Sequence, residues 1–310
     1  MFLMLYYQNI KNYANLDQKL WYFFVSMFLA VTTSLIVGTL TGAGGEIQGR
    51  GANFQGNKGF FIGANEVGII LCILTTIMYM VYRNNRKLLL LGAALVIMVC
   101  GIIVFTKSSL IASLLAVLFL WIKIHYLRPI TIITIVSVIV YLRDNITLFW
   151  NFIEGSFFNT LFQNPISFLF RGRQHYIDAF MTNVQVYEHP VNSVVQVFFG
   201  NGDWQTVQWI SSGLGINSPF RTSFEMDFFD VLSALGLIGF SCYVFFASKL
   251  FNVLGRSSFC NNNKAIKLGI LAIIAHSFIA GHVIFSIQIT LLLTILYAFS
   301  KAKLEQEASY

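Results

Sequence analysis

One uncharged run near the C-terminus limits what this chain can fold into. Residues 268–300, between Lys267 and Lys301, hold no Asp, Glu, Lys or Arg over 33 residues. A helix rises about 1.5 Å per residue and crosses the hydrocarbon layer with about 20 apolar residues. The run is too long for one crossing. It therefore predicts two membrane helices, with the turn between them at 280–282.

The composition of the whole chain agrees with a membrane protein. Of its 310 residues, 56% are hydrophobic and 11% are charged, whereas a soluble domain is about 25% charged. The net charge of +7 is therefore interpreted as a topology signal and as membrane-surface anchors, and nucleic-acid binding is not expected. The cysteines and histidines show no metal-binding spacing such as CxxC or HExxH. The predicted fold class is an all-α integral membrane protein.

The apolar runs predict about eight transmembrane helices. These are expected at residues 21–40, 60–82, 88–106, 108–126, 129–148, 228–250, 265–281 and 283–300. Loops on the side of the N-terminus hold about twice as many Lys and Arg residues as loops on the other side, and positive residues favour the inside. Both termini are therefore expected inside. The predicted organisation is an N-terminal transmembrane bundle, a large outer loop, and a C-terminal bundle with a short cytoplasmic tail, at residues 1–142, 143–227 and 228–310.

The outer loop, residues 143–227, is long enough to suggest that it carries function. It contains no lysine but four arginines, Arg143, Arg171, Arg173 and Arg221. The planar guanidinium group suits bidentate contacts to phosphate or carboxylate. Surface salt bridges are the alternative role for the pair at 171 and 173.

A helix at 173–182 would carry an apolar stripe. Its members are Tyr176, Ile177 and Phe180. Such a stripe is typical of a helix that lies on a membrane surface. If the helix forms, this part of the outer loop could rest on the bilayer.

Three acids, Glu225, Asp227 and Asp230, stand at the front of the sixth predicted span. The last two are three residues apart, so they share a face if the helix has begun. Acids also cap helix N-termini, which is the simplest explanation for Asp227. Asp230 is expected deeper, where an ionisable group is costly and marks a functional candidate. Three carboxylates could alternatively hold a divalent metal, although no further ligand motif accompanies them.

Two other segments place polar groups at the outer ends of spans. The glycine-rich stretch 49–68 carries Arg50 and sets Asn65 and Glu66 just inside an apolar run. The alternative to a functional role for Asn65 and Glu66 is a glycine-rich re-entrant loop whose glutamate snorkels to the membrane surface. Lys107 is the one charge between two apolar runs. It is either an interfacial anchor or a cation placed to bind a lipid phosphate.

These motifs, in this order, resemble the bacterial O-antigen ligase and polysaccharide polymerase family. The resemblance covers residues from about 40 to 300, and the matching motifs are GANE, TKSS, RGR, FFGNG and GxxG at 63–66, 106–109, 171–173, 198–202 and 236–239. Eleven residues before Gly236, the ligases have a histidine where this chain has Glu225, and Met226 takes the following Asn/Ser place. The acid is more similar to the polymerase-type relatives. The family commonly has about twelve spans, so this chain is either a fragment lacking N-terminal helices or a short member.

The resemblance implies a GT-C-like glycosyltransferase of the bacterial cytoplasmic membrane. It would transfer glycan from a polyprenyl diphosphate, such as undecaprenyl diphosphate, to an acceptor hydroxyl at the outer face, with polymerisation favoured over ligation. Glu225, with Asp227, would take the proton from the acceptor hydroxyl. A glutamate with the ordinary pKa of about 4.3 is ionised at neutral pH and can accept it. The developing diphosphate charge would be stabilised by fixed cations. These are Arg171, Arg173, Arg221, Lys107 and Arg50.

The same resemblance implies the supporting residues and the partners. The supporting residues are Asn65, Glu66, Asp230, Gly236 and Gly239. With several cations at the diphosphate, no metal or other cofactor is expected. The expected partners are the lipid-linked oligosaccharide donor, the glycan acceptor, membrane lipids and other polysaccharide-assembly membrane proteins. A transporter or flippase is the competing class, and it would show paired charges at mid-membrane, internal repeats and broken helices.

Overall fold

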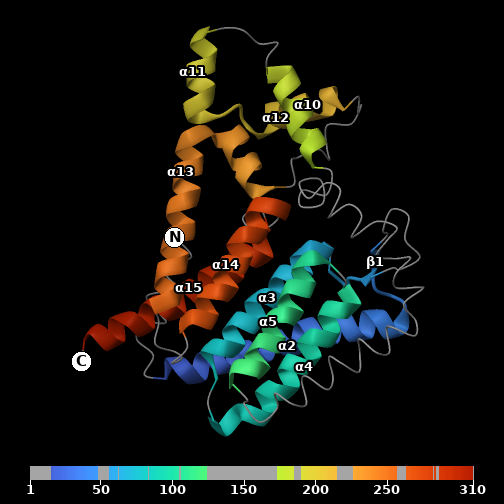
Figure 1. The fold of residues 1–310 in the computed structure, drawn as a ribbon, viewed down its shortest axis with the longest axis vertical. Coiled ribbons are helices and arrows are strands. Elements are labelled where there is room, and N and C mark those ends of the chain that lie inside the picture. Colours follow the sequence, from blue (N-terminus) through green and yellow to red (C-terminus); the bar gives the residue numbers. More distant parts are fainter. Residues whose placement is uncertain are drawn as a thin grey trace. The chain divides into compact units, whose positions relative to one another are not determined.

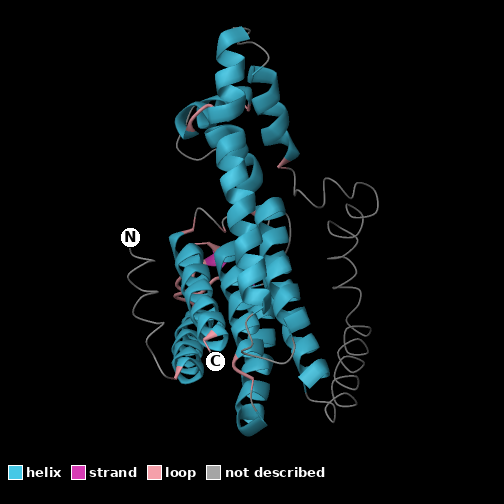
Figure 2. Cartoon of the chain, turned by 90° about the vertical axis from the view of Figure 1, so that its left-hand side faces the viewer, coloured by secondary structure: helices cyan, strands magenta, loops and turns pink. Residues whose placement is uncertain are grey.

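The computed structural model describes most of the helical part of the chain. The described residues are 15–47, 56–61, 63–82, 84–104, 106–123, 173–184, 190–214, 226–256, 263–281, 283 and 286–309. Apart from one short antiparallel strand pair, β1 (Glu46–Ile47) with β2 (Gly56–Asn57), these residues form helices and loops (Figure 2). The chain divides into two compact units, which are described separately below. Unit 1 is 1–137, 249–274 and 286–310, and unit 2 is 138–248 and 275–285.

Among the described helices, four are long and apolar enough to cross a membrane, judged by length and composition. They are α2 (Leu16–Thr41), α4 (Lys87–Val104), α13 (Asp227–Arg256) and α15 (Ile287–Ala308). Three more helices coincide with further predicted spans: α3 (Ala64–Met80), α5 (Lys107–Lys123) and α14 (Asn263–Ala280). Their apolar stretches are shorter, at Ala64–Met80, Ser108–Trp121 and Ile266–Phe278. The predicted span at 129–148 lies outside the described residues. The chain is thus a predominantly helical protein with four candidate membrane helices.

The uncharged run 268–300 forms two helices, as its length predicts. Helix α14 ends at Ala280 and α15 begins at Ile287. Gly281 follows α14 with a φ of 61°, a left-handed conformation that glycine adopts at little cost. The predicted start of the turn is confirmed, but α15 begins four residues later than the predicted span at 283–300.

The core of unit 1 is built around α3. Every residue of α3 from Val67 to Met80 is buried, and α4 and α5 both pack against it. The Tyr79 ring meets Phe119 of α5 edge-on, with centroids 4.8 Å apart. Small residues let the helices approach closely, because a side chain on Gly68 would collide with Ser108.

Unit 2 contains three short helices, α10 (Gln174–Val184), α11 (Pro190–Phe199) and α12 (Asp203–Gly213) (Figure 1). Helix α10 packs on α12, and the Phe180 and Trp209 rings lie 5.6 Å apart. The helix on which an apolar stripe at 173–182 depends is therefore present, as α10. The predicted membrane role of its apolar stripe is wrong. Those three side chains pack against the buried residues Ile210 and Met226, because α12 and the start of α13 give the stripe a protein partner.

Helix α13 is broken at Gly236, so the predicted continuous span 228–250 is interrupted. Gly236 has φ 65° and ψ −163°, a region that is open essentially to glycine alone. We call residues 227–235 the first segment of α13 and residues 237–256 the second segment. Phe228 and Phe240 bring the two segments into contact, with ring centroids 4.8 Å apart. The first segment therefore folds back beside the second (Figure 1).

Candidate functional site

The break in α13 is occupied by the loop Gly200-Asn201-Gly202. In a continuous helix the carbonyls of Ser233 and Ala234 would accept the N–H groups four residues later. Here Asn201 N–H donates to the Ser233 carbonyl at 2.8 Å, and Gly202 N–H donates to the Ala234 carbonyl at 3.0 Å. The loop thus satisfies the carbonyl groups that the break releases.

Glycine is required on both sides of this junction. A Cβ built on Gly236 would lie 2.5 Å from the backbone nitrogen of Gly200, and a Cβ on Gly200 would lie 2.5 Å from that of Gly236. Both residues also have positive φ. Gly239 lies one helical turn on, against the Leu235 side chain. The FFGNG and GxxG motifs, separate in the sequence, are therefore one structural element, which we call the glycine junction.

Asp227 is fully buried at the start of the first segment, with an exposed fraction of 0%. Its Oδ2 accepts a hydrogen bond from Ser277 Oγ at 2.6 Å and another from the Val283 N–H at 2.9 Å. The Tyr243 hydroxyl in turn donates to Ser277 Oγ at 3.0 Å. The carboxylate therefore ties the start of α13 to the end of α14 and to the turn after it.

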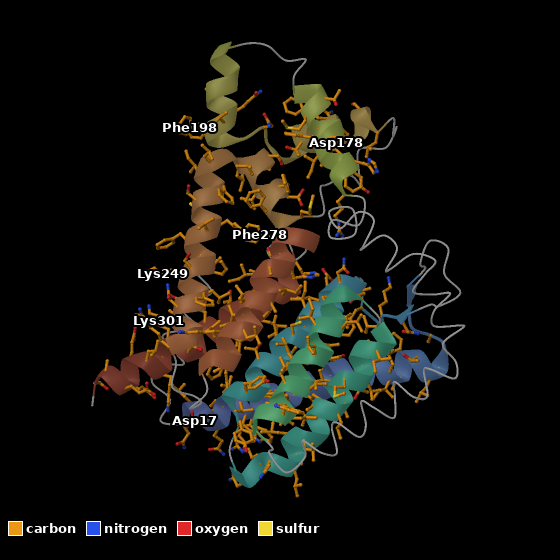
Figure 3. All side chains as sticks on the ribbon, viewed as in Figure 1. Asp17, Asp178, Phe198, Lys249, Phe278 and Lys301 are labelled. Atoms are coloured by element: carbon orange, nitrogen blue, oxygen red, sulfur yellow. The ribbon has the colours of Figure 1, made fainter. Side chains whose placement is uncertain are left out.

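Aromatic rings surround this chain of hydrogen bonds. Phe278, labelled in Figure 3, lies 5.2 Å from Phe228 and 5.8 Å from Tyr243, centroid to centroid. Phe240 lies 6.2 Å from Tyr243. In such apolar surroundings, hydrogen bonds to a carboxylate are stronger than in water, and leaving one unmade is costly.

Asp230 has a different role from the one expected. Its Oδ2 accepts the Met226 N–H at 3.1 Å, while its own N–H donates to the Met226 carbonyl at 2.9 Å. Asp230 is half-buried and closes the first turn of the helix. The sequence favoured Asp227 as the capping acid and Asp230 as the deeper one, and the structure reverses these two environments.

The predicted cation and base positions are only partly described. Arg173, at the start of α10 in unit 2, is buried, with 6% of its surface exposed. The backbone of Lys107 begins α5 in unit 1. Four predicted site residues lie outside the described residues: Arg50, Arg171, Arg221 and Glu225. Their roles stay predictions.

In unit 1 the TKSS segment forms a capping box at the start of α5. Thr106 N–H donates to Ser109 Oγ at 2.8 Å, and Ser109 N–H donates to Thr106 Oγ1 at 3.2 Å. This reciprocal pair satisfies two helix-end donors. Lys107 stands at the first helical position, where a cation opposes the helix dipole. Helix stability therefore does not account for a lysine at this position.

The same end of unit 1 joins TKSS to the GANE motif. Ser108 Oγ donates to the Asn65 carbonyl at 3.4 Å. Glu66 is half-buried in the first turn of α3, where an acid suits the dipole. The structure therefore brings together two further motifs on which the resemblance rests.

Sequence reasoning missed the residues that hold Asp227. Ser277 and Val283 lie 50 and 56 residues further along the chain, so no local pattern pairs them with it. The one available signal was a serine and a histidine inside an otherwise apolar run. Within the part of the chain that the structure describes, no group of three or more His, Cys, Asp or Glu side chains could hold a metal ion. Comparison with protein-family models, with curated proteins and with solved structures finds no match.

Proposed function

We propose that this chain is a membrane glycosyltransferase that uses a polyprenyl-diphosphate-linked oligosaccharide as its donor. The observation that carries the proposal is the glycine junction. Two motifs that resemble those of the O-antigen ligase and polysaccharide polymerase family meet there through backbone hydrogen bonds from Asn201 and Gly202. Polymerisation is favoured over ligation, because Glu225 takes the place of the ligase histidine.

The proposed reaction is a displacement at the anomeric carbon of the donor sugar. The acceptor oxygen forms a bond to this carbon as the bond from carbon to diphosphate oxygen breaks. The acceptor proton passes to Glu225, and the polyprenyl diphosphate leaves as an anion stabilised by the cations. Asp227, two residues after Glu225, is held by Ser277 and Val283. Its part in this proposal is to fix the start of α13 close to the base.

A transporter or flippase is the second candidate, and one observation favours it. An apolar helix interrupted in its first third, with a buried carboxylate before the break, is typical of transporter substrate sites. Asp227 and Gly236 supply both features. The transporter interpretation assigns Asp227 to substrate or ion binding and makes no use of Glu225 as a base.

Reconstitution distinguishes the two. Purified protein in liposomes would receive radiolabelled lipid-linked oligosaccharide, with no ATP and no ion gradient. The glycosyltransferase proposal expects longer or transferred glycan together with released polyprenyl diphosphate. Movement of intact donor across the bilayer without glycan transfer would overturn it in favour of the transporter. Asp178→Asn serves as a control, because Asp178 is exposed on α10 and is not assigned to the site.

A further inference from the structure

Exposed apolar side chains surround the glycine junction. They come from the end of α11 and from both sides of the break in α13, and each is 42–65% exposed. We call this set the apolar collar: Val195, Val197, Phe198, Phe199, Leu235, Leu237 and Ile238. Phe198 marks its position in Figure 3. No charged residue occurs from Pro190 to Gly202, so the part of the collar on α11 has no charged neighbour along the chain.

The uncharged part of the second segment of α13 is too short to cross a bilayer by itself. Between Gly236 and Lys249 it holds about 12 uncharged residues, or about 18 Å at the rise of an α-helix. The hydrocarbon layer is about 30 Å thick, and a lysine that snorkels to the headgroups recovers only part of the difference. If Lys249 marks one boundary, the apolar layer extends past the break.

Helix α11 and the collar lie next to the Gly236 end of the second segment, opposite its Lys249 end. The Gly200–Gly236 contact fixes the end of α11 there, and Figure 1 shows α11 beyond the break, in line with the second segment. Further along the same helix, the second segment exposes more apolar side chains, namely Val244, Phe245 and Phe246. The apolar collar and these side chains of the second segment should therefore face the same solvent.

We propose that the apolar collar is embedded in the bilayer leaflet farther from Lys249. The end of α11 thus completes the crossing that Gly236 interrupts. The occupant of this surface is lipid, because the surface continues a membrane helix and carries no charge. The membrane contact predicted for α10 belongs to α11. This inference does not depend on glycosyl transfer.

Site-directed spin labelling in liposomes tests the proposal. The four native cysteines would be replaced, and Phe199→Cys would be labelled with a nitroxide. Collision rates with oxygen, which concentrates in lipid, and with a water-soluble nickel chelate would be measured by electron paramagnetic resonance. The matched control is Gln208→Cys, an exposed polar position on α12 in the same unit. Val197→Cys is the second collar position, in case Phe199→Cys does not fold.

The collar label should collide several-fold more often with oxygen than with nickel, and the control label should show the reverse. A collar label as accessible to nickel as the control would place the collar in water. A label shielded from both reagents would show that a protein surface covers it. Either result would overturn the proposal.

Discussion

Gly200 and Gly236 pack backbone against backbone, and neither position has room for a side chain. A Cβ on Gly236 would lie 2.5 Å from the Gly200 nitrogen. This contact fixes where α13 breaks, which carbonyl groups the loop satisfies, and where α11 ends. The structure of unit 2 around the candidate site therefore depends on it.

Gly236→Ala should destabilise the protein more than Gly202→Ala. Both glycines have positive φ with extended ψ, Gly236 at 65° and −163° and Gly202 at 74° and 155°. An alanine in this region costs about 1–3 kcal/mol. At Gly202 nothing lies within 4 Å of the added carbon, whereas at Gly236 a steric collision adds about 1–3 kcal/mol. Thermal unfolding in detergent would measure the order, and equal losses would contradict the close contact.

Ser277→Ala should lower the free energy of unfolding by about 1.5–3 kcal/mol, which is the usual contribution of a hydrogen bond to a charged group. Tyr243→Phe should cost less, because Tyr243 donates to the serine and not to the carboxylate. A double-mutant cycle of Ser277→Ala with Asp227→Asn should show coupling of about 0.5–3 kcal/mol. Simple additivity in urea or thermal unfolding would show that the 2.6 Å contact contributes little.

Thr106→Ala should lower the free energy of unfolding by about 0.5–2 kcal/mol, because the helix loses its cap. Because Thr106 and Ser109 satisfy each other's backbone donors, the double alanine variant should cost less than the two single changes added together. Unfolding midpoints of the three variants test this. Full additivity would mean that the two side chains act independently.

Lys107→Gln should leave thermal stability unchanged or slightly higher, because it removes a cation from the positive end of a helix. If Lys107 binds the donor phosphate, the variant should lose about 10- to 100-fold in donor affinity, as expected for one charge-assisted contact. Donor titration of the reconstituted protein measures the affinity. Unchanged affinity would reduce Lys107 to an interfacial anchor.

Sequence reasoning predicted the features that depend on length and local composition. The turn after Ala280 follows from a run too long for one helix, and the apolar stripe within 173–182 follows from helical spacing. The span at 228–250 was correctly placed but its break was not predicted. Hydropathy averages over a window, and a single glycine in an apolar run does not lower that average.

The environments of individual acids could not be predicted, because they are set by distant chain segments. Asp227 is buried through partners on α14 and the following turn, and Asp230 caps the helix through Met226. The stripe of α10 likewise acquires its partner from α12. An apolar face in the sequence shows that something covers it, but not whether this is lipid or protein.

The most direct test of the central claim is the release of polyprenyl diphosphate from lipid-linked donor by purified Glu225→Gln protein. The wild-type protein should release one polyprenyl diphosphate for each glycan transferred. The variant should lose about 10²- to 10⁴-fold in rate, the usual contribution of a general base, with an unchanged unfolding temperature. Release at the wild-type rate by Glu225→Gln, or none by the wild-type protein, would contradict the proposed function.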